Sequence, residues 1–323
     1  MVDDCYGWWL IVSLKCPCMV SRLALVVPLV TTMATSFSSL PIVDMSTLSQ
    51  TEPSPAGLTA LRQRLYDAFS TTGFAYLINA PLRFGHEEVF QLAGDFFSIG
   101  EAEKIKLAKK TFANRNRNTY RGYFPTQAGQ QDNLKEGFEI GPPQSQQQTP
   151  DSRHLRVSLS EANVWPAGAE FANSRTQLEE LHQQPQTLSA TLLSLLAVAL
   201  EKPDDYFASY LVDSLSTLRL LHYPPQAIST KLQTDEVSLC CTPHTDSGIL
   251  TLLHQDPTGG LEVLNADGNW VAAPCMPGSI VVNVGESFSR SERWAIRGDD
   301  ASCAHQHRRA SKRRRSLEYT VLL

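Results

Sequence analysis

The chain has 323 residues, enough for one large domain or two ordinary ones. Hydrophobic residues make up 42% of it and charged residues 19%, proportions typical of a globular protein with a sizeable core. The formal net charge of −5 argues against nucleic acid as a general partner. The seven cysteines are odd in number and include no C-x-x-C pair, so we expect free thiols and a cytoplasmic protein rather than a disulfide framework.

The first 32 residues are apolar but interrupted. Lys15, Pro17 and Arg22 break them before any uncharged run reaches the roughly 18 residues that indicate a membrane span. The start Met-Val-Asp-Asp lacks the basic residues of a signal peptide. We therefore predict a poorly structured extension over residues 1–32 and no membrane partner, with membrane association as the alternative.

The region 33–170 alternates between short strands and helices. A strand is expected at 40–46, followed by an amphipathic helix in which leucines recur at helical spacing until Gly73 ends it. A strand is expected at 74–79 and a second helix over 86–108. The stretch 112–160 is rich in Asn, Gln, Gly and Pro and predicts loops with short strands.

The region 171–323 begins with a predicted helix over 172–200 and continues as short β-like runs. Asp267-Gly268 between two of these runs indicates a hairpin. Helices followed by many short strands favour an α+β fold with helices packed against a double-sheet or barrel core. The runs cover residues 216–225, 248–255, 260–274, 278–286 and 316–323.

His244 and Asp246 stand two residues apart, ahead of the apolar run Ile249–Leu253. On a strand, residues i and i+2 point to the same face, and an unpaired charge facing an interior is costly. A metal ion would make this pair tolerable. The alternative is a surface turn, and the stretch alone does not decide between the two.

An iron site needs a third ligand from another strand, because two histidines and one carboxylate form the facial triad of non-haem iron oxygenases. His254 continues the same strand and lies too far along it, whereas His305 and His307 follow two further strands. An acidic co-substrate would need an arginine fork. Arg314 and Ser316 are two residues apart and would face one side of the last strand, although this basic run is also typical of a surface.

In combination, these motifs resemble those of the iron(II)- and 2-oxoglutarate-dependent dioxygenases of the isopenicillin N synthase-like group. The resemblance rests on H-T-D at 244–246, a distal histidine, and R-x-S at 314–316. It runs from about residue 40 to the C-terminus and includes LPIVDMS, TGFAYLINAPL, RGYFP, LRLLHYPP and GSIVVNVGE. It implies a double-stranded β-helix, or jelly roll, with flanking helices. The core and its backing helix then occupy residues 171–323, after an N-terminal region over 33–170.

The resemblance also implies a ligand set and a chemistry. His244, Asp246 and His305 would hold Fe(II), with His307 as the alternative third ligand, and Tyr223, Arg314 and Ser316 would bind 2-oxoglutarate. Oxygen is the second co-substrate and ascorbate the expected reductant. The expected reaction is hydroxylation or desaturation of a small organic substrate in secondary metabolism, by a monomer.

Two segments are expected on the substrate side of the site, at 118–124 and 135–141. They contain Arg121 and Lys135. The alternative is that these segments are packed loops whose two cationic side chains are solvated.

The chain departs from the family pattern after residue 286, which suggests a truncated or aberrant end. Three other functions therefore stay open. One is a catalytically inactive relative or scaffold, and another is an iron oxidase that does not consume 2-oxoglutarate. The third is a zinc hydrolase, which would not need Arg314 and Ser316. Stoichiometric release of succinate distinguishes the dioxygenase from all three.

Overall fold

The computed structural model describes residues 37–127, 133–142, 161–168, 171–211, 216–224, 238–291, 303–307 and 318–322. The predicted extension over 1–32 lies outside these ranges. The strands are β1 (Ile42–Asp44), β2 (Phe74–Ile78), β3 (Gly122–Phe124), β4 (Glu136–Ile140), β5 (Leu218–Tyr223), β6 (Ser238–Leu239), β7 (Leu250–Gln255), β8 (Leu261–Leu264), β9 (Trp270–Ala272), β10 (Ser279–Val284), β11 (Cys303–His307) and β12 (Glu318–Leu322). The α-helices are α1 (Pro55–Thr71), α2 (His86–Phe97), α3 (Glu101–Lys106), α4 (Ala172–Ala199) and α5 (Glu286–Ser291).

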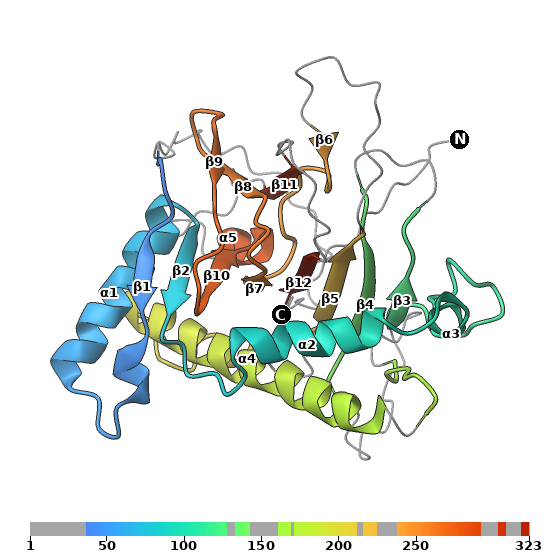
Figure 1. Ribbon diagram of the computed structural model, residues 1–323. Helices are drawn as coiled ribbons and strands as arrows, with labels where there is room; N and C mark the ends of the chain where they lie inside the picture. Colours follow the sequence, from blue (N-terminus) through green and yellow to red (C-terminus); the bar gives the residue numbers. More distant parts are fainter. Residues whose placement is uncertain are drawn as a thin grey trace, which may run out of the picture.

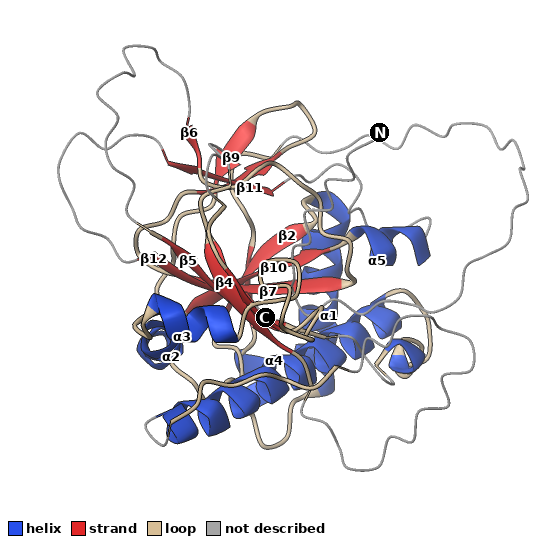
Figure 2. Ribbon diagram, turned by 90° about the vertical axis from the view of Figure 1, so that its right-hand side faces the viewer, coloured by secondary structure: helices blue, strands red, loops and turns tan. Residues whose placement is uncertain are grey.

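The described strands form two sheets. One has eight strands in the order β1-β2-β10-β7-β12-β5-β4-β3, and the other has four in the order β6-β11-β8-β9. Helices α1, α2 and α4 lie on one side of the larger sheet and the smaller sheet lies on the other (Figures 1 and 2). This double-sheet core with helices against one face agrees with the α+β jelly roll that the sequence predicts.

The larger sheet is buried on both faces, and each face has its own hydrophobic core. Strand β5 illustrates the division, because successive side chains of a strand point to opposite faces. Leu218 and Leu220 belong to the core shared with the helices. Leu221 and Tyr223 belong to the core that also contains residues of the smaller sheet. The candidate site lies on this second, inter-sheet side.

Both halves of the chain contribute strands to the larger sheet. Strand β2 pairs with β10 through a register that joins Tyr76 to Val281. At the other end of the sheet, β4 pairs with β5 and joins Glu139 to Arg219. The regions 33–170 and 171–323 therefore build one sheet together.

Two predicted features differ from the structure. The single helix expected over 86–108 is divided, because Gly100 has an extended ψ of 143° and starts α3 as a new helix. Strands β6 and β11 are not among the predicted runs, since β6 has only two residues and nothing in the sequence of β11 alternates clearly between apolar and polar residues.

The helix predicted over 172–200 is confirmed by α4, which continues through Pro185 and buries one face. No helix in the described ranges is long and apolar enough to cross a membrane.

A buried ionic cluster ties the helices to the larger sheet. The Glu136 carboxylate on β4 accepts hydrogen bonds from Lys104 Nζ of α3 at 2.8 Å and from Tyr123 Oη of β3 at 2.6 Å. His222 Nδ1 of β5 lies 2.6 Å from the other carboxylate oxygen. Burial alone would raise the pKa of Glu136, but the hydrogen bonds from His222, Lys104 and Tyr123 outweigh it and lower the pKa to about 2.

This depressed pKa predicts a loss of stability in acid. The Glu136 contribution is complete above its ordinary pKa of 4.5 and disappears as the pH falls towards 2. At about 1.4 kcal/mol per pKa unit, it amounts to at most roughly 3 kcal/mol. Urea denaturation between pH 6 and pH 2.5 should therefore show a steeper acid loss for the wild-type protein than for Glu136→Gln. Parallel pH profiles for the two proteins would contradict this account.

Candidate active site

His244 and Asp246 lie close together in the segment that precedes β7. His244 Nε2 is 3.6 Å from Asp246 Oδ1. The pair is not part of a strand, because β7 begins only at Leu250. The expected proximity is therefore present, but a loop produces it rather than the alternation of a strand. Asp246 is buried, and its carboxylate faces the inter-sheet side of the larger sheet through its partners on two strands.

Those partners hold one oxygen of the Asp246 carboxylate. Thr251 Oγ1 of β7 and Asn283 Nδ2 of β10 each donate a hydrogen bond of 2.7 Å to Asp246 Oδ2. Thr251 and Asn283 are directly paired in the β7–β10 register, so both side chains project from one face. On the other residue, His244 Nδ1 lies 2.9 Å from the carbonyl oxygen of Thr242. Oδ1 and Nε2 are thereby turned towards each other.

The backbone of the same segment is held by the end of β10. The N–H group of Glu286 donates to the carbonyl oxygen of Asp246 at 2.7 Å, and that of Gly285 donates to Ile249 at 2.9 Å. Glycine is needed at position 285, because a Cβ there would collide with the carbonyl oxygen of Gly248 and lie 2.7 Å from that of Asp246. The motif V-G-E after β10 thus fixes the position of the acidic residue.

The electrostatics of the pair favour bound positive charge. Burial disfavours the charged form of both side chains, but the opposite charges of the two groups outweigh it. They raise the pKa of His244 to about 9 and hold the pKa of Asp246 below its ordinary value. An imidazole nitrogen and a carboxylate oxygen that share a cation are two of the three donors in a non-haem iron site. The donor set therefore fits Fe(II).

Of the other predicted site residues, the structure describes Tyr223 in full and only the backbone of His305. Tyr223 ends β5 and is buried in the inter-sheet core. The backbone of His305 is in β11, paired with Leu261 of β8. Arg314 and Ser316 lie outside the described residues. Within the described part of the chain, no group of three or more His, Cys, Asp and Glu side chains is assembled that could hold a metal ion.

Arg121 and Lys135 are both buried, which contradicts the alternative that they are solvated. Arg121 Nη1 donates to Thr217 Oγ1. Lys135 Nζ is 3.6 Å from Cys241 Sγ, which itself lies 4.0 Å from His244 Nδ1. Burial lowers the pKa of Lys135 to about 7. Lys135 therefore contacts Cys241, which in turn contacts His244 of the candidate metal pair.

Sequence reasoning missed three residues at this site. Thr251 and Asn283 have no local signal, because their function depends on the register between two strands. Arg219 does have a local signal, because it is a charged residue within the apolar strand LRLLHY. It is four residues from Tyr223, so both side chains point to the same face of the strand. It is completely buried and forms an ion pair with Glu139.

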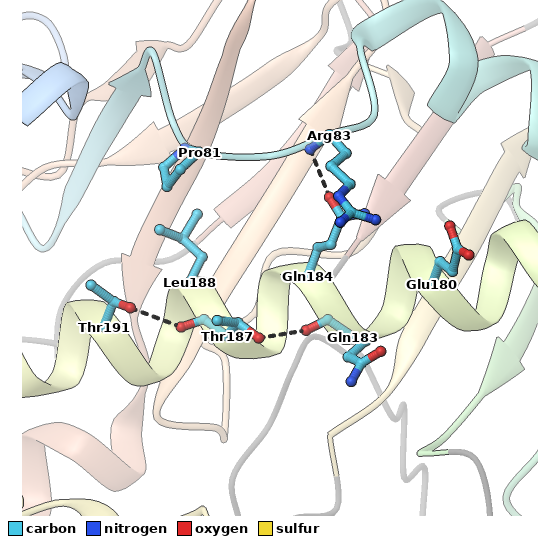
Figure 3. A pocket seen from close by; sticks show the side chains of 8 residues that line it. All are labelled: Pro81, Arg83, Glu180, Gln183, Gln184, Thr187, Leu188 and Thr191. Carbon is cyan, nitrogen blue, oxygen red and sulfur yellow. Dashed lines mark hydrogen bonds between the residues drawn. The ribbon is translucent and has the colours of Figure 1, made fainter. Parts of the chain in front are cut away.

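A cavity of about 380 Å³ lies elsewhere, along α4 (Figure 3). Most of its wall belongs to α4, and the remainder comes from the connection between β2 and α2. None of its lining residues belongs to β5, β7 or β10, so it is separate from the site around Asp246. The lining residues are Pro81, Arg83, Glu180, Gln183, Gln184, Thr187, Leu188 and Thr191.

Comparison with known proteins identifies the class of this arrangement. Residues 214–321 match the 2OG-Fe(II) oxygenase superfamily, and residues 40–168 match the N-terminal region described as "non-haem dioxygenase in morphine synthesis". A 2-oxoglutarate-dependent dioxygenase of Didymella fabae is 32% identical over 79% of this chain and 77% of its own length. Clavatol oxidase of Penicillium crustosum is 31% identical over 83% and 80%. The chain belongs to the 2OG-Fe(II) oxygenase superfamily and is a 2-oxoglutarate-dependent dioxygenase.

Solved structures confirm the fold. A full-length Neurospora crassa protein, crystallised in complex with alpha-KG, superposes with a TM-score of 0.72 over 90% of this chain and 85% of its own, at 22% identity. A 2OG-Fe(II) oxygenase family protein of Caulobacter crescentus gives a TM-score of 0.69 over 88% and 86%, at 25% identity. The predicted double-stranded β-helix with flanking helices is therefore correct.

The close approach at Gly285 generates a test of the loop that carries Asp246. Gly285→Ala should push this loop away from the end of β10 and cost about 1–3 kcal/mol, as overpacking typically does. We expect a lower Tm and weaker retention of Fe(II), measured by thermal unfolding and by transfer of iron to ferrozine. Gly100→Ala is the control, because a Cβ there has nothing within 4 Å. Equal behaviour of the two variants would contradict the close contact.

Proposed function

We propose that this dioxygenase hydroxylates or desaturates a small organic substrate in secondary metabolism, with His244, Asp246 and His305 as its iron ligands. The observation that carries the proposal is the pair His244–Asp246. His244 Nε2 and Asp246 Oδ1 face each other at 3.6 Å. The other oxygen of the Asp246 carboxylate accepts hydrogen bonds from Thr251 and Asn283. The names of two relatives, the clavatol oxidase of Penicillium crustosum and a proline hydroxylase of Petromyces alliaceus, support a small-molecule substrate.

The pairing of β11 supports His305 as the third ligand. His305 is opposed to Leu261, and Leu261 is buried in the inter-sheet core. On its other edge, β11 pairs with β6, which leads directly into the segment that carries His244. His307 has the same parity as His305 and is the alternative.

Tyr223, Arg314 and Ser316 are proposed to bind the far carboxylate of 2-oxoglutarate. Tyr223 is opposed to Glu318 in the register of β5 and β12. Arg314 and Ser316 precede Glu318 by four and two residues, so they have its parity in the sequence. An arginine fork with a neighbouring hydroxyl is a typical partner of a carboxylate.

His244, Asp246 and His305 would hold the iron, which would supply the activation of oxygen that couples decarboxylation of 2-oxoglutarate to substrate oxidation. The contributions of this chain are positional. His244 and Asp246 present two donors on one side of the site, and hydrogen bonds to Asp246 fix their orientation. Apolar side chains of the inter-sheet core, such as Leu221, Leu253 and Val281, exclude water from the region around them.

The cellular setting is proposed with the function. The odd cysteine count and the three free thiols among the described residues fit a reducing compartment, so we propose a cytoplasmic enzyme. We propose that it acts as a monomer, with ascorbate as the reductant and without nucleic acid or membrane partners.

Release of succinate tests the function. Purified protein with Fe(II), ascorbate and 2-oxoglutarate should release succinate even without the true substrate, through uncoupled turnover. His244→Ala and Asp246→Ala should each lower this rate at least about 100-fold, because removing a metal ligand costs more than removing its supporting residue. Both variants should still fold, with a lower Tm because each leaves a buried polar group without one of its partners. A folded wild-type protein that releases no succinate would instead favour an inactive relative or scaffold.

The third ligand is tested by a matched pair of variants. His305→Ala should lose Fe(II) binding and succinate release, whereas His307→Ala should retain most of both. Calorimetric titration with Fe(II) under anaerobic conditions gives the affinity of each variant. The opposite ranking would assign His307 as the ligand, and full activity of both variants would contradict the site.

A further inference from the structure

The inter-sheet side of the larger sheet contains an arginine that the reaction described above does not use. Arg219 is 0% exposed and is the largest fully buried side chain of the described residues. It alternates along β5 with Leu218 and Leu220, which face the helices, and shares the parity of Tyr223, which faces the inter-sheet core. Its guanidinium therefore lies inside the jelly roll.

The side chains around Arg219 provide acceptors for only some of the N–H groups of its guanidinium. Nη2 pairs with Glu139 Oε1, directly across the β4–β5 ladder. The guanidinium carbon lies 5.8 Å from the centre of the Phe124 ring. Within the described part of the chain, Nε and Nη1 have no hydrogen-bond partner. A buried donor without a partner costs about 1–3 kcal/mol, and more when it is charged.

Charge is also unbalanced around Arg219. Glu139 pairs with Lys109 through its other oxygen, and the charge of Arg121 also acts on it. One carboxylate thus serves three cations, and the ammonium of Lys135 acts on Arg219 as a further positive charge. Glu161 also acts on Arg121 and accepts hydrogen bonds from three backbone N–H groups, and it is not among the charges that act most strongly on Arg219.

Arg219 lies in the part of β5 that is nearer the candidate metal pair: it is opposed to Leu322 of β12, which is opposed to Leu253 of β7, two residues after Thr251. Burial lowers the pKa of Arg219, and the carboxylate of Glu139 opposes this most strongly, followed by Asp246. The proposed site for the far carboxylate of 2-oxoglutarate is at Tyr223, whose backbone is four residues and therefore about 13 Å along β5, although the charge of its side chain also acts on Arg219. A co-substrate that extends from the iron to Tyr223 leaves Arg219 for another molecule.

We propose that Arg219 binds the carboxylate of the substrate, so that this enzyme oxidises a small organic acid. The inference rests on the proposed function, because it places this acid beside the iron held by His244 and Asp246. A carboxylate would supply the acceptors that Nε and Nη1 lack and would neutralise the excess positive charge on this wall. The uncharged amide of the same acid would supply an acceptor but no charge.

Paired acids and amides test the proposal directly. The probes are benzoate, phenylacetate and 3-phenylpropionate, each with its primary amide, added to anaerobic protein that contains Fe(II) and 2-oxoglutarate. At least one acid should raise the Tm more than its amide, by about 2–4 °C for a tenfold preference in affinity. Arg219→Met should abolish this difference. The control Arg175→Met should keep it, because Arg175 is on the surface of α4.

Two results would overturn the proposal. One is equal shifts, including none, for every acid and its amide in the wild-type protein. The other is an Arg219→Met variant that keeps the preference for acids. Should Arg219→Met fail to fold, Arg219→Lys replaces it and should weaken the preference by about tenfold, since lysine keeps the charge but not the fork.

The KM for 2-oxoglutarate separates this proposal from the proposed function. In the succinate assay, Arg219→Met should leave that KM within about twofold of the wild-type value. A tenfold rise would assign Arg219 to the co-substrate and overturn the inference. Absence of succinate from the wild-type protein would refute the proposed function, while the comparison of acids with amides would still report on Arg219.

Discussion

The buried carboxylate of Asp246 is the constraint on which the site depends. A carboxylate inside a protein is tolerated only where hydrogen bonds and opposite charge compensate for lost water. Here the compensation comes from Thr251 and Asn283, which are partners in one ladder, and from His244. A slip of β7 against β10 by one residue would turn Thr251 to the opposite face and end its pairing with Asn283. The correct pairing of two apolar strands therefore also sets the geometry of the polar site.

Strands β4 and β5 carry two groups of buried charged side chains, one on each face of the larger sheet. On the helix side of β4 and β5, Glu136 is saturated by Lys104, Tyr123 and His222, so the cluster joins elements and leaves no capacity for a ligand. On the inter-sheet side, the opposed pair Glu139–Arg219 is not balanced. Glu136 and Glu139 are three residues apart on β4, but the charge of Glu136 is fully compensated, whereas the pair Glu139–Arg219 retains donors that a ligand could use.

Much of this architecture could be predicted from local periodicity and turn chemistry. The short apolar runs LRLLHY and GILTLLHQ, bounded by Gly and Pro, predict β5 and β7, and Asp267-Gly268 predicts the β8–β9 hairpin, where Gly268 has a φ of +78°. Contacts that depend on register could not be predicted, such as those of Thr251 and Asn283 with Asp246. The same limit explains why β11 was missed, because its strand form depends on pairing with β6 and β8.

Lysine and arginine differ in how they can respond to the excess positive charge inside the jelly roll. Burial lowers the pKa of Lys135 to about 7, so this residue can lose its proton near neutral pH and relieve the repulsion. Arg219 keeps its proton in a folded protein even where burial lowers its pKa, because the guanidinium begins from a much higher value. The positive charge at Arg219 is therefore permanent, and Glu139 is already shared with Lys109. Bound iron would add further positive charge beside Asp246. The site with iron, 2-oxoglutarate and substrate bound would then approach neutrality only through the negative charges of the co-substrate and the substrate. A substrate carboxylate at Arg219 would provide one such charge, next to the Nε and Nη1 groups for which no described side chain is an acceptor.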